Sequence, residues 1–364
     1  MNLSLLLGVI IISLVLLEII LRLITPSPLY PNNGNKDFTF YEYDETLGWK
    51  NKPNTEGPFV MSDSKSLIKI NSQGLRDDET MYERKDNQTL RIQIYGDSMT
   101  WGFGVNKTER YTEFFEATLQ KKLQKPVEVI NFGVSGYSTD QELLLLKTEG
   151  IKYDTDIIIF ALFDNDIPEL GKTEVSSYSK PKFVLQEGVL ALTHVPVPQR
   201  AQSWEINAYD ENKFLSKVHF FLKKSKAYHT VQRLLFKLSF ISDLFLEEET
   251  KKENEENLYG LHDALLREAK KISEEQENTF VLFLLPRYEE VYQNEPAKTL
   301  QQIASFAEQE EIIYSNALPY LQEQGKKEKD FYFDFDRHWN TKGNRVIGEF
   351  FADELIRMGI VEHE

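Results

Sequence analysis

The hydrophobic and polar positions change their period along the chain. From Leu90 onward, short apolar runs alternate with longer segments whose apolar residues recur at helical spacing. Buried strands are predicted at 92–95, 127–132, 156–163 and 280–285, with a shorter one at 312–314. Helices are predicted at 111–123, 140–150 and 344–358. Strands that alternate with helices are typical of an α/β domain whose parallel sheet is covered on both faces.

An almost continuous apolar run occupies the N-terminus, from Leu3 to Ile24. As a helix, about 20 such residues span the hydrocarbon core of a bilayer. Neither the basic start nor the small-x-small site of a cleaved signal peptide accompanies this run. We therefore expect residues 1–27 to form a retained signal anchor, a transmembrane helix, with a buried core helix as the alternative. The rest of the chain is then expected outside the cytoplasm, in the periplasm or at the cell surface.

Residues 28–89 are polar and rich in Asn, Pro and Gly, and they predict an ordered lead-in segment. Its aromatic residues, Trp49 and Phe59 among them, need burial, so the segment is expected to pack on the main domain at 90–364. The alternation of strands and helices breaks off at 167–258. We expect this stretch to be an insertion, helical in its second half, that covers the carboxyl edge of the sheet.

The net charge and the absence of cysteine restrict the partners and the chemistry that we expect of the chain, and they say less about its fold. The 364 residues carry a formal net charge of −16, which disfavours nucleic acid and anionic lipid surfaces as partners of the soluble part. The chain has no cysteine, which excludes disulfides, a cysteine nucleophile and cysteine-ligated zinc. The sequence also lacks the motifs of nucleotide-binding loops and zinc proteases. No cofactor and no metal is therefore expected.

The strand predicted at 92–95 ends in the triplet 96–98 (Gly-Asp-Ser), which places a hydroxyl at the carboxyl edge of the sheet. Ligands bind at this edge in open α/β sheets. Ser98 becomes a nucleophile there only if a histidine takes its proton and a third group orients that histidine. His338 is the candidate base, with Asp336 close before it and the last predicted helix after it. On its own, Gly-Asp-Ser is also an ordinary turn sequence.

Polar residues and glycines also follow the next two predicted strands. Two glycines come after the strand at 127–132, and the second of them is Gly136. Glycines at a strand end let backbone N–H groups approach an oxyanion closely. Asn165 follows the strand at 156–163, and its side-chain amide can donate to the same oxyanion. Either site could equally be an ordinary turn.

Taken in order along the chain, these residues resemble the sequence blocks of the SGNH hydrolases, also called the GDSL family. The resemblance covers residues 90–166 and 278–358. It implies a three-layer α/β/α, flavodoxin-like fold with a five-stranded parallel sheet. The segments Asn71–Arg76 and Tyr137–Leu143 look like the membrane-anchored bacterial branch. The chain is similar to the polysaccharide O-acetyltransferase and acetylesterase members.

The resemblance also implies a role for each site residue. Ser98 matches the nucleophile and His338 matches the base. The N–H groups of Ser98 and Gly136 and the amide of Asn165 match the donors of the oxyanion hole. In this arrangement the base takes the proton of the nucleophile and later gives it to the leaving alcohol.

Two positions depart from the family pattern. Many members carry an Asp three residues before the histidine, where this chain has Phe335. The resemblance therefore favours Asp336 as the acid of the triad, with Asp334 as a competitor that spacing alone does not separate. Asp164 stands before the oxyanion asparagine, where a glycine is common, and this affects the expected size and charge of the pocket.

The expected function is that of a serine esterase or O-acyltransferase. It would act on O-acyl groups, above all O-acetyl, of a cell-envelope glycan or of a small ester. The alternative is a catalytically silent, glycan-binding scaffold with the same fold. The sequence leaves open the acyl group, the acceptor and the choice between hydrolysis and transfer.

Overall fold

The computed structural model of this chain describes residues 40–60, 63–84, 86, 88–175, 178–199, 248–327, 330–334 and 336–362, together with Ser13 and Leu16. The chain divides into two compact units, residues 1–32 with 201–254 and residues 33–200 with 255–364. In the first unit, Ser13, Leu16 and residues 248–254 are helical. All candidate site residues belong to the second unit.

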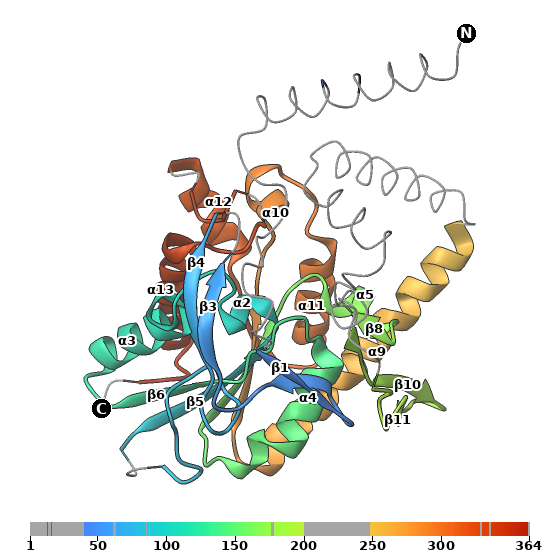
Figure 1. Cartoon of the computed structure of the whole chain (residues 1–364), viewed down its shortest axis with the longest axis horizontal. Helices are drawn as coiled ribbons and strands as arrows, with labels where there is room; N and C mark the ends of the chain where they lie inside the picture. Colours follow the sequence, from blue (N-terminus) through green and yellow to red (C-terminus); the bar gives the residue numbers. More distant parts are fainter. Residues whose placement is uncertain are drawn as a thin grey trace. The chain divides into compact units, whose positions relative to one another are not determined.

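A five-stranded parallel sheet forms the centre of the second unit (Figure 1). Its strands are β5 (Leu90–Gly96), β6 (Val127–Asn131), β7 (Ile157–Leu162), β12 (Thr279–Leu284) and β13 (Ile313–Asn316). They lie in the order β13-β12-β7-β5-β6, which is the 2-1-3-4-5 order of flavodoxin-like sheets when counted along the chain. The predicted five-stranded parallel sheet is confirmed. The order reverses between β5 and β7, and ligands bind at such switch points.

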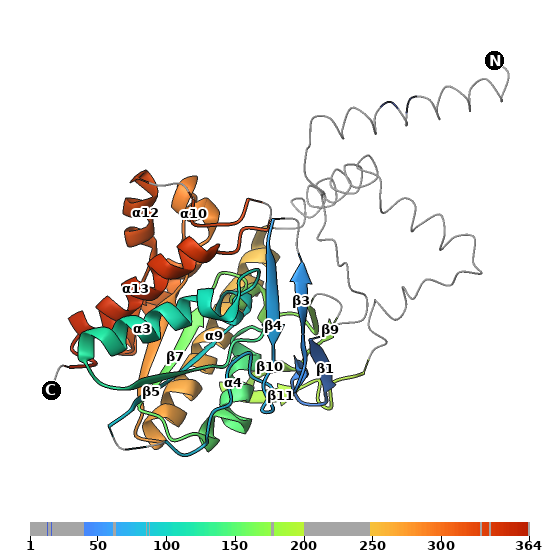
Figure 2. The ribbon, with the colours of Figure 1, turned by 60° about the vertical axis from the view of Figure 1, so that its left-hand side comes forward.

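Alternate residues of each strand pack on opposite faces of the sheet. In β7, Ile157 and Ile159 belong to one core and Ile158 and Phe160 to the other. The first core includes residues of α3 (Tyr111–Leu123) and α13 (Thr341–Arg357), and the second includes residues of α4 (Thr139–Thr148), α9 (Glu248–Glu275) and α11 (Lys298–Gln309). Figure 2 shows α3 and α13 together on their side of the sheet. These layers form an α/β/α sandwich, as the sequence predicted.

Shorter elements complete the described part of the chain. Its remaining helices are α2 (Ser98–Trp101), α5 (Asp166–Leu170), α10 (Tyr288–Tyr292) and α12 (Leu318–Lys327), with 3-10 turns at Lys107–Glu109 and Gly150–Lys152. Antiparallel pairs are formed by β1 (Tyr41–Asp44) with β2 (Gly48–Asn51), β3 (Glu56–Val60) with β4 (Lys65–Lys69), β8 (Glu174–Val175) with β9 (Tyr178–Ser179), and β10 (Lys182–Gln186) with β11 (Val189–Thr193).

The lead-in segment packs on the central sheet through its aromatic residues. Trp49 is only 2% exposed and belongs to the same core as Tyr95 and Phe132. The ring of Tyr137, just after β6, meets the ring of Trp49 edge-on at 5.4 Å, and its hydroxyl donates to the carbonyl of Trp49. Phe59 is partly buried against Trp101, the last residue of the short helix α2 that follows β5.

Two predictions fall partly or wholly outside the described residues. The expected insertion at 167–258 begins with most of α5 and the hairpins β8–β9 and β10–β11, so its first half contains strands that the sequence did not indicate. Residues 200–247, most of its expected helical half, lie outside the described residues. So does the predicted anchor at 1–27, apart from Ser13 and Leu16. None of the helices in the described ranges has the length and apolarity to cross a membrane.

Candidate active site

The turn after β5 presents Ser98 at the carboxyl edge of the sheet. Asp97 caps the following helix, because its carboxylate accepts the backbone N–H of Met99 at 2.8 Å. Helix α2 therefore begins at Ser98. Only a glycine fits at position 96, since a Cβ there would lie 2.2 Å from the hydroxyl oxygen of Thr100. The Gly-Asp-Ser triplet thus combines a tight turn, a helix cap and a half-buried serine at the edge of the sheet.

His338 lies beside this serine, although 240 residues separate the two in sequence. Its Nε2 is 2.7 Å from the hydroxyl oxygen of Ser98. The histidine belongs to a short hairpin-like turn before α13, in which Phe333 N–H donates to the carbonyl of His338 at 2.8 Å. The ring of Phe103 stacks on the imidazole with 4.5 Å between ring centres. The nucleophile and base predicted from the sequence are therefore within hydrogen-bonding distance.

Of the two candidate acids, Asp336 is the one that faces the histidine. Its Oδ1 accepts the backbone N–H of His338 at 3.0 Å, and its Oδ2 lies 3.5 Å from Nδ1 of the ring. Asp334 is exposed. Both residues lie in turns, so the rule that residues two positions apart in an extended strand point to the same side does not apply to them. The geometry therefore separates two residues that sequence spacing could not.

The two predicted oxyanion donors follow the strands on either side of β5. Gly136, after β6, has a φ of +80°, and a Cβ on it would lie 3.4 Å from Trp49. Asn165, after β7, precedes α5, and its Nδ2 lies 3.5 Å from a carboxylate oxygen of Glu169. The Asn165 side chain lowers the pKa of Asp97, the neighbour of Ser98, although burial raises this pKa more. The parallel sheet thus brings the ends of three adjacent strands to one site.

Three buried carboxyl groups interact close to Ser98, and the sequence analysis gave none of them a role. Asp97, Glu142 and Asp166 are exposed by 2%, 0% and 0%. Burial raises the pKa of each, and the charges of neighbouring carboxylates raise the pKa values of Glu142 and Asp166 further. Within the described part of the chain, neither carboxyl oxygen of Glu142 has a hydrogen-bond partner. A retained proton avoids the large cost of an unpaired charge at this position.

Lys180 supplies a positive charge to the same cluster. Its Nζ donates to Asp140 at 2.9 Å and to the hydroxyl of Ser138 at 2.7 Å, and all three side chains are buried. It lowers the pKa of Glu142, but burial has the larger effect. A signal was present in the sequence, because Asp140 and Glu142 open a helix that continues with four leucines at 143–146. Polar residues in such a buried helix need partners.

Asp164, the departure from the family pattern, forms an ion pair at the rim of the site. Its Oδ2 lies 2.7 Å from Nε of Arg287, which follows β12. Burial raises the pKa of Asp164, and the Arg287 guanidinium lowers it. In the described ranges, no group of three or more His, Cys, Asp or Glu residues could hold a metal ion. The arrangement supports nucleophilic chemistry by Ser98 with His338 as its base.

No family model and no curated protein matches this chain. Solved structures similar to it include a lipolytic protein of the G-D-S-L family from Veillonella parvula, with 13% identity, a TM-score of 0.41 and coverage of 74% of this chain and 98% of that one. Another is the acetylxylan esterase Axe2 from Geobacillus stearothermophilus, with 14% identity, a TM-score of 0.40 and coverage of 73% and 94%. A third, the acetyl xylan esterase AlAXEase, has 11% identity, a TM-score of 0.43 and coverage of 73% and 100%.

The names of these structures agree with the resemblance to the SGNH or GDSL hydrolases seen in the sequence. Their TM-scores lie below 0.5, so they carry no argument about the activity of this chain.

Proposed function

We propose that this chain is an SGNH-type serine esterase that removes O-acyl groups, above all O-acetyl groups. The observation that carries the proposal is the 2.7 Å approach of Ser98 Oγ to His338 Nε2. This pair lies at the switch point of a flavodoxin-like sheet, where ligands bind. A serine held against an imidazole at such an edge has the geometry of an activated nucleophile.

The reaction follows from these positions in two halves. In the first, Ser98 Oγ attacks the ester carbonyl while His338 Nε2 takes the hydroxyl proton. The tetrahedral oxyanion is held by the N–H groups of Ser98 and Gly136 and by the amide of Asn165, each donor contributing about 3 kcal/mol. The intermediate then expels the alcohol, which receives the proton from His338, and leaves an acyl-enzyme. In the second half, a water molecule attacks the acyl group and the same proton transfers restore the serine.

Asp336 holds the imidazole in the tautomer that this cycle needs. With its proton on Nδ1, facing the carboxylate, the ring presents an unprotonated Nε2 to Ser98. The distance of 3.5 Å between Nδ1 and the carboxylate is longer than a hydrogen bond. Such contacts shorten in substrate complexes. The same carboxylate, through its bond to the backbone of His338, fixes the turn that carries the ring.

The acceptor of the acyl group decides between hydrolysis and transfer. If a sugar hydroxyl takes the place of water, the same acyl-enzyme gives an O-acyltransferase. We include both reactions in the proposal, with an acylated cell-envelope glycan as the substrate class. The acidic net charge of −16 favours a neutral or cationic glycan over an anionic polymer.

The test uses the purified full-length chain and an aryl acetate, with and without glycan acceptors. An esterase releases the aryl alcohol and acetate, and a transferase moves acetate to the glycan. A fluorophosphonate probe should label the wild-type chain and fail to label Ser98→Ala. Equal labelling of both proteins would overturn the assignment of the nucleophile. Glycan binding without any Ser98-dependent turnover would support the silent scaffold instead.

The proposal includes a membrane anchor at 1–27 and an extracytoplasmic catalytic unit. It is supported by the apolar length of Leu3 to Ile24 and by the missing cleavage site. Protease added outside intact cells should digest the catalytic unit, and the mature chain should keep its N-terminus. A mature chain that begins near residue 26, or a catalytic unit spared by the protease, would contradict this placement.

A further inference from the structure

The segment Asn71–Arg76 precedes the catalytic domain in sequence, yet it reaches the active-site loop. Asn71 Oδ1 accepts the backbone N–H groups of Gln73 at 2.9 Å and Leu75 at 2.8 Å. Its side-chain amide donates to the carbonyl of Asp78 at 2.9 Å. These bonds fold the segment into a tight turn and fix the direction in which its last residue points. Arg76, at the end of the turn, is only 1% exposed.

The guanidinium of Arg76 binds the backbone of the loop that follows α2. Its two terminal nitrogens donate to three carbonyls, those of Trp101 at 2.8 Å, Gly102 at 2.5 Å and Val105 at 2.5 Å. The guanidinium also lies 4.6 Å from the centre of the Trp101 ring. The loop 101–105 contains two glycines in the left-handed region, and its own backbone bonds run from Phe103 N–H to the carbonyl of Ser98 at 3.0 Å and from Val105 N–H to the carbonyl of Gly102 at 3.3 Å. Arg76 adds three bonds that tie this backbone to the lead-in segment.

This loop forms one wall of the histidine site. Phe103 stacks on the His338 ring at 4.5 Å, with an angle of 29° between the planes. A Cβ on Gly104 would lie 2.7 Å from the ring of Phe333, which belongs to the turn that carries His338. A displacement of the loop would therefore move the surface against which the imidazole rests.

We propose that Arg76 is a positioning residue of the active site, which holds the loop 101–105 so that Phe103 fixes the ring of His338. This inference rests on the proposed esterase function. It also gives the motif at Asn71–Arg76 a role, because the turn of this motif aims the guanidinium at the loop. Lysine would not substitute, since one ammonium group cannot match the fork that reaches three carbonyls.

A second buried arginine holds the backbone of Arg76 in place. Arg110, which is fully buried, donates to the backbone carbonyl of Arg76 and forms ion pairs with Asp77 and Glu113. Burial lowers the pKa of Arg76 to about 9, and the charge of Arg110 adds to the effect. The guanidinium keeps its charge, so its bonds to the backbone carbonyls are charge-assisted.

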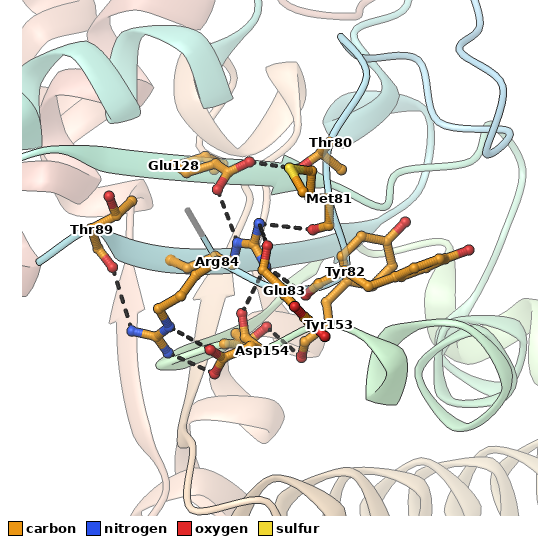
Figure 3. Close-up of polar contacts among 12 residues, drawn as sticks. Thr80, Met81, Tyr82, Glu83, Arg84, Thr89, Glu128, Tyr153 and Asp154 are labelled. Carbon is orange, nitrogen blue, oxygen red and sulfur yellow. Dashed lines mark hydrogen bonds and ion pairs between the residues drawn. The ribbon is translucent and has the colours of Figure 1, made fainter. Parts of the chain in front are cut away.

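Arg91 provides a matched control at the opposite end of β5. It is fully buried, and its guanidinium donates to the backbone carbonyls of Met81 and Asp154 at 2.8 and 3.2 Å. It also forms an ion pair with Glu128 at 2.9 Å. Figure 3 shows these partners around the amino end of the strand, with the ion pair between Arg84 and Asp154 beside them. Arg91→Lys therefore disturbs a comparable set of bonds to backbone carbonyls, at the end of β5 away from Ser98.

The experiment compares Arg76→Lys, Arg76→Ala and Arg91→Lys in the full-length chain. For Arg76→Lys we expect kcat on an aryl acetate to fall about 10- to 100-fold, with KM within about twofold, because a misplaced base slows the chemical step. The acidic limb of the pH profile of kcat/KM should shift as the His338 ring loses its contact with Phe103. Added guanidinium ion should restore part of the activity of Arg76→Ala. Arg91→Lys should lower the melting temperature and leave kcat within about twofold.

A readout independent of activity is amide hydrogen exchange in the loop 101–105. Exchange there should speed up in Arg76→Lys and remain unchanged in Arg91→Lys. Wild-type kcat and unchanged loop exchange in Arg76→Lys would overturn the proposal, as would an equal loss of kcat in Arg91→Lys. If the wild-type chain shows no Ser98-dependent turnover, the proposed function fails, and loop exchange alone then decides whether Arg76 positions the site.

Discussion

Replacement of Asp336 by asparagine separates the orientation of His338 from the stability of the fold. In the structure, Oδ1 of Asp336 accepts the backbone N–H of His338 at 3.0 Å, and Oδ2 faces Nδ1 at 3.5 Å. Asparagine keeps an oxygen for the backbone N–H and turns an amide N–H toward Nδ1. Because this amide donates, Nδ1 becomes an acceptor and the ring proton moves to Nε2. That nitrogen can then no longer take the proton of Ser98.

The expected loss of kcat for Asp336→Asn is about 10³- to 10⁴-fold, the range for a base held in the wrong tautomer. This corresponds to about 4 to 5 kcal/mol in the activation free energy. The free energy of unfolding should change by less than about 1 kcal/mol, because the bond to the His338 backbone persists. Asparagine also has nearly the size and shape of aspartate, so this side chain, which is 18% exposed, keeps its packing.

The assay is steady-state hydrolysis of an aryl acetate together with thermal unfolding of each variant. Asp334→Asn is the matched control, since Asp334 is exposed and lies in the same turn. It should keep both kcat and melting temperature near the wild-type values. A loss of turnover in Asp334→Asn with normal turnover in Asp336→Asn would refute the argument and transfer the acid role to Asp334.

Three further outcomes are expected. Asn165→Ala should lower kcat by about 10²- to 10³-fold with KM little changed, and a loss below about threefold would remove this residue from the oxyanion hole. Gly136→Ala should lower both stability and kcat, because φ is +80° there and the left-handed region costs other residues about 1 to 2 kcal/mol; unchanged kinetics would contradict its role. The third outcome concerns Glu142. Its pKa is higher in the folded state, so the folded protein keeps a proton that the unfolded chain releases, and the free energy of unfolding falls as pH rises. In urea titrations between about pH 5 and about pH 8, the free energy of unfolding should fall less in Glu142→Gln than in the wild-type chain. The same pH dependence in both proteins would contradict this expectation.

The central sheet could be predicted because its strands are buried on both faces. The run at 156–163 became β7 at Ile157–Leu162, and the run at 280–285 became β12 at Thr279–Leu284. A continuous apolar run of this length that lies between predicted helices is best explained as a strand buried on both faces. The order of the strands came from the family resemblance and not from the pattern of residues.

The small hairpins could not be predicted in the same way. Strand β8 has only two residues, Glu174 and Val175, and β1 is the sequence Tyr-Glu-Tyr-Asp at 41–44. Elements this short have no period to detect, and their stability comes from packing on the domain and not from local preference. The end of the expected insertion at 167–258, which was predicted to be helical in its second half, is helical from Glu248 onward, as the beginning of α9.

The site was predictable where its residues form local runs. Ser98 and His338 each sit in a recognisable run, so order along the chain was enough to pair them. The acid was different, because Asp334 and Asp336 are separated only by the turn that exposes one and directs the other to the ring. Glu142 received no role because its raised pKa comes from complete burial, which the four leucines after it only suggest.

The active site joins three parts of the chain, and only two of them belong to the strand-helix pattern. Ser98 comes from the end of β5, and His338 comes from the turn before α13. The third part is the lead-in segment, whose Arg76 binds the loop between them through backbone carbonyls. Carbonyl partners leave no residue-type signature, so no motif could reveal this link. The compact unit that carries the proposed active site therefore extends upstream of residue 90, and in our proposal the lead-in segment helps to hold His338 in place.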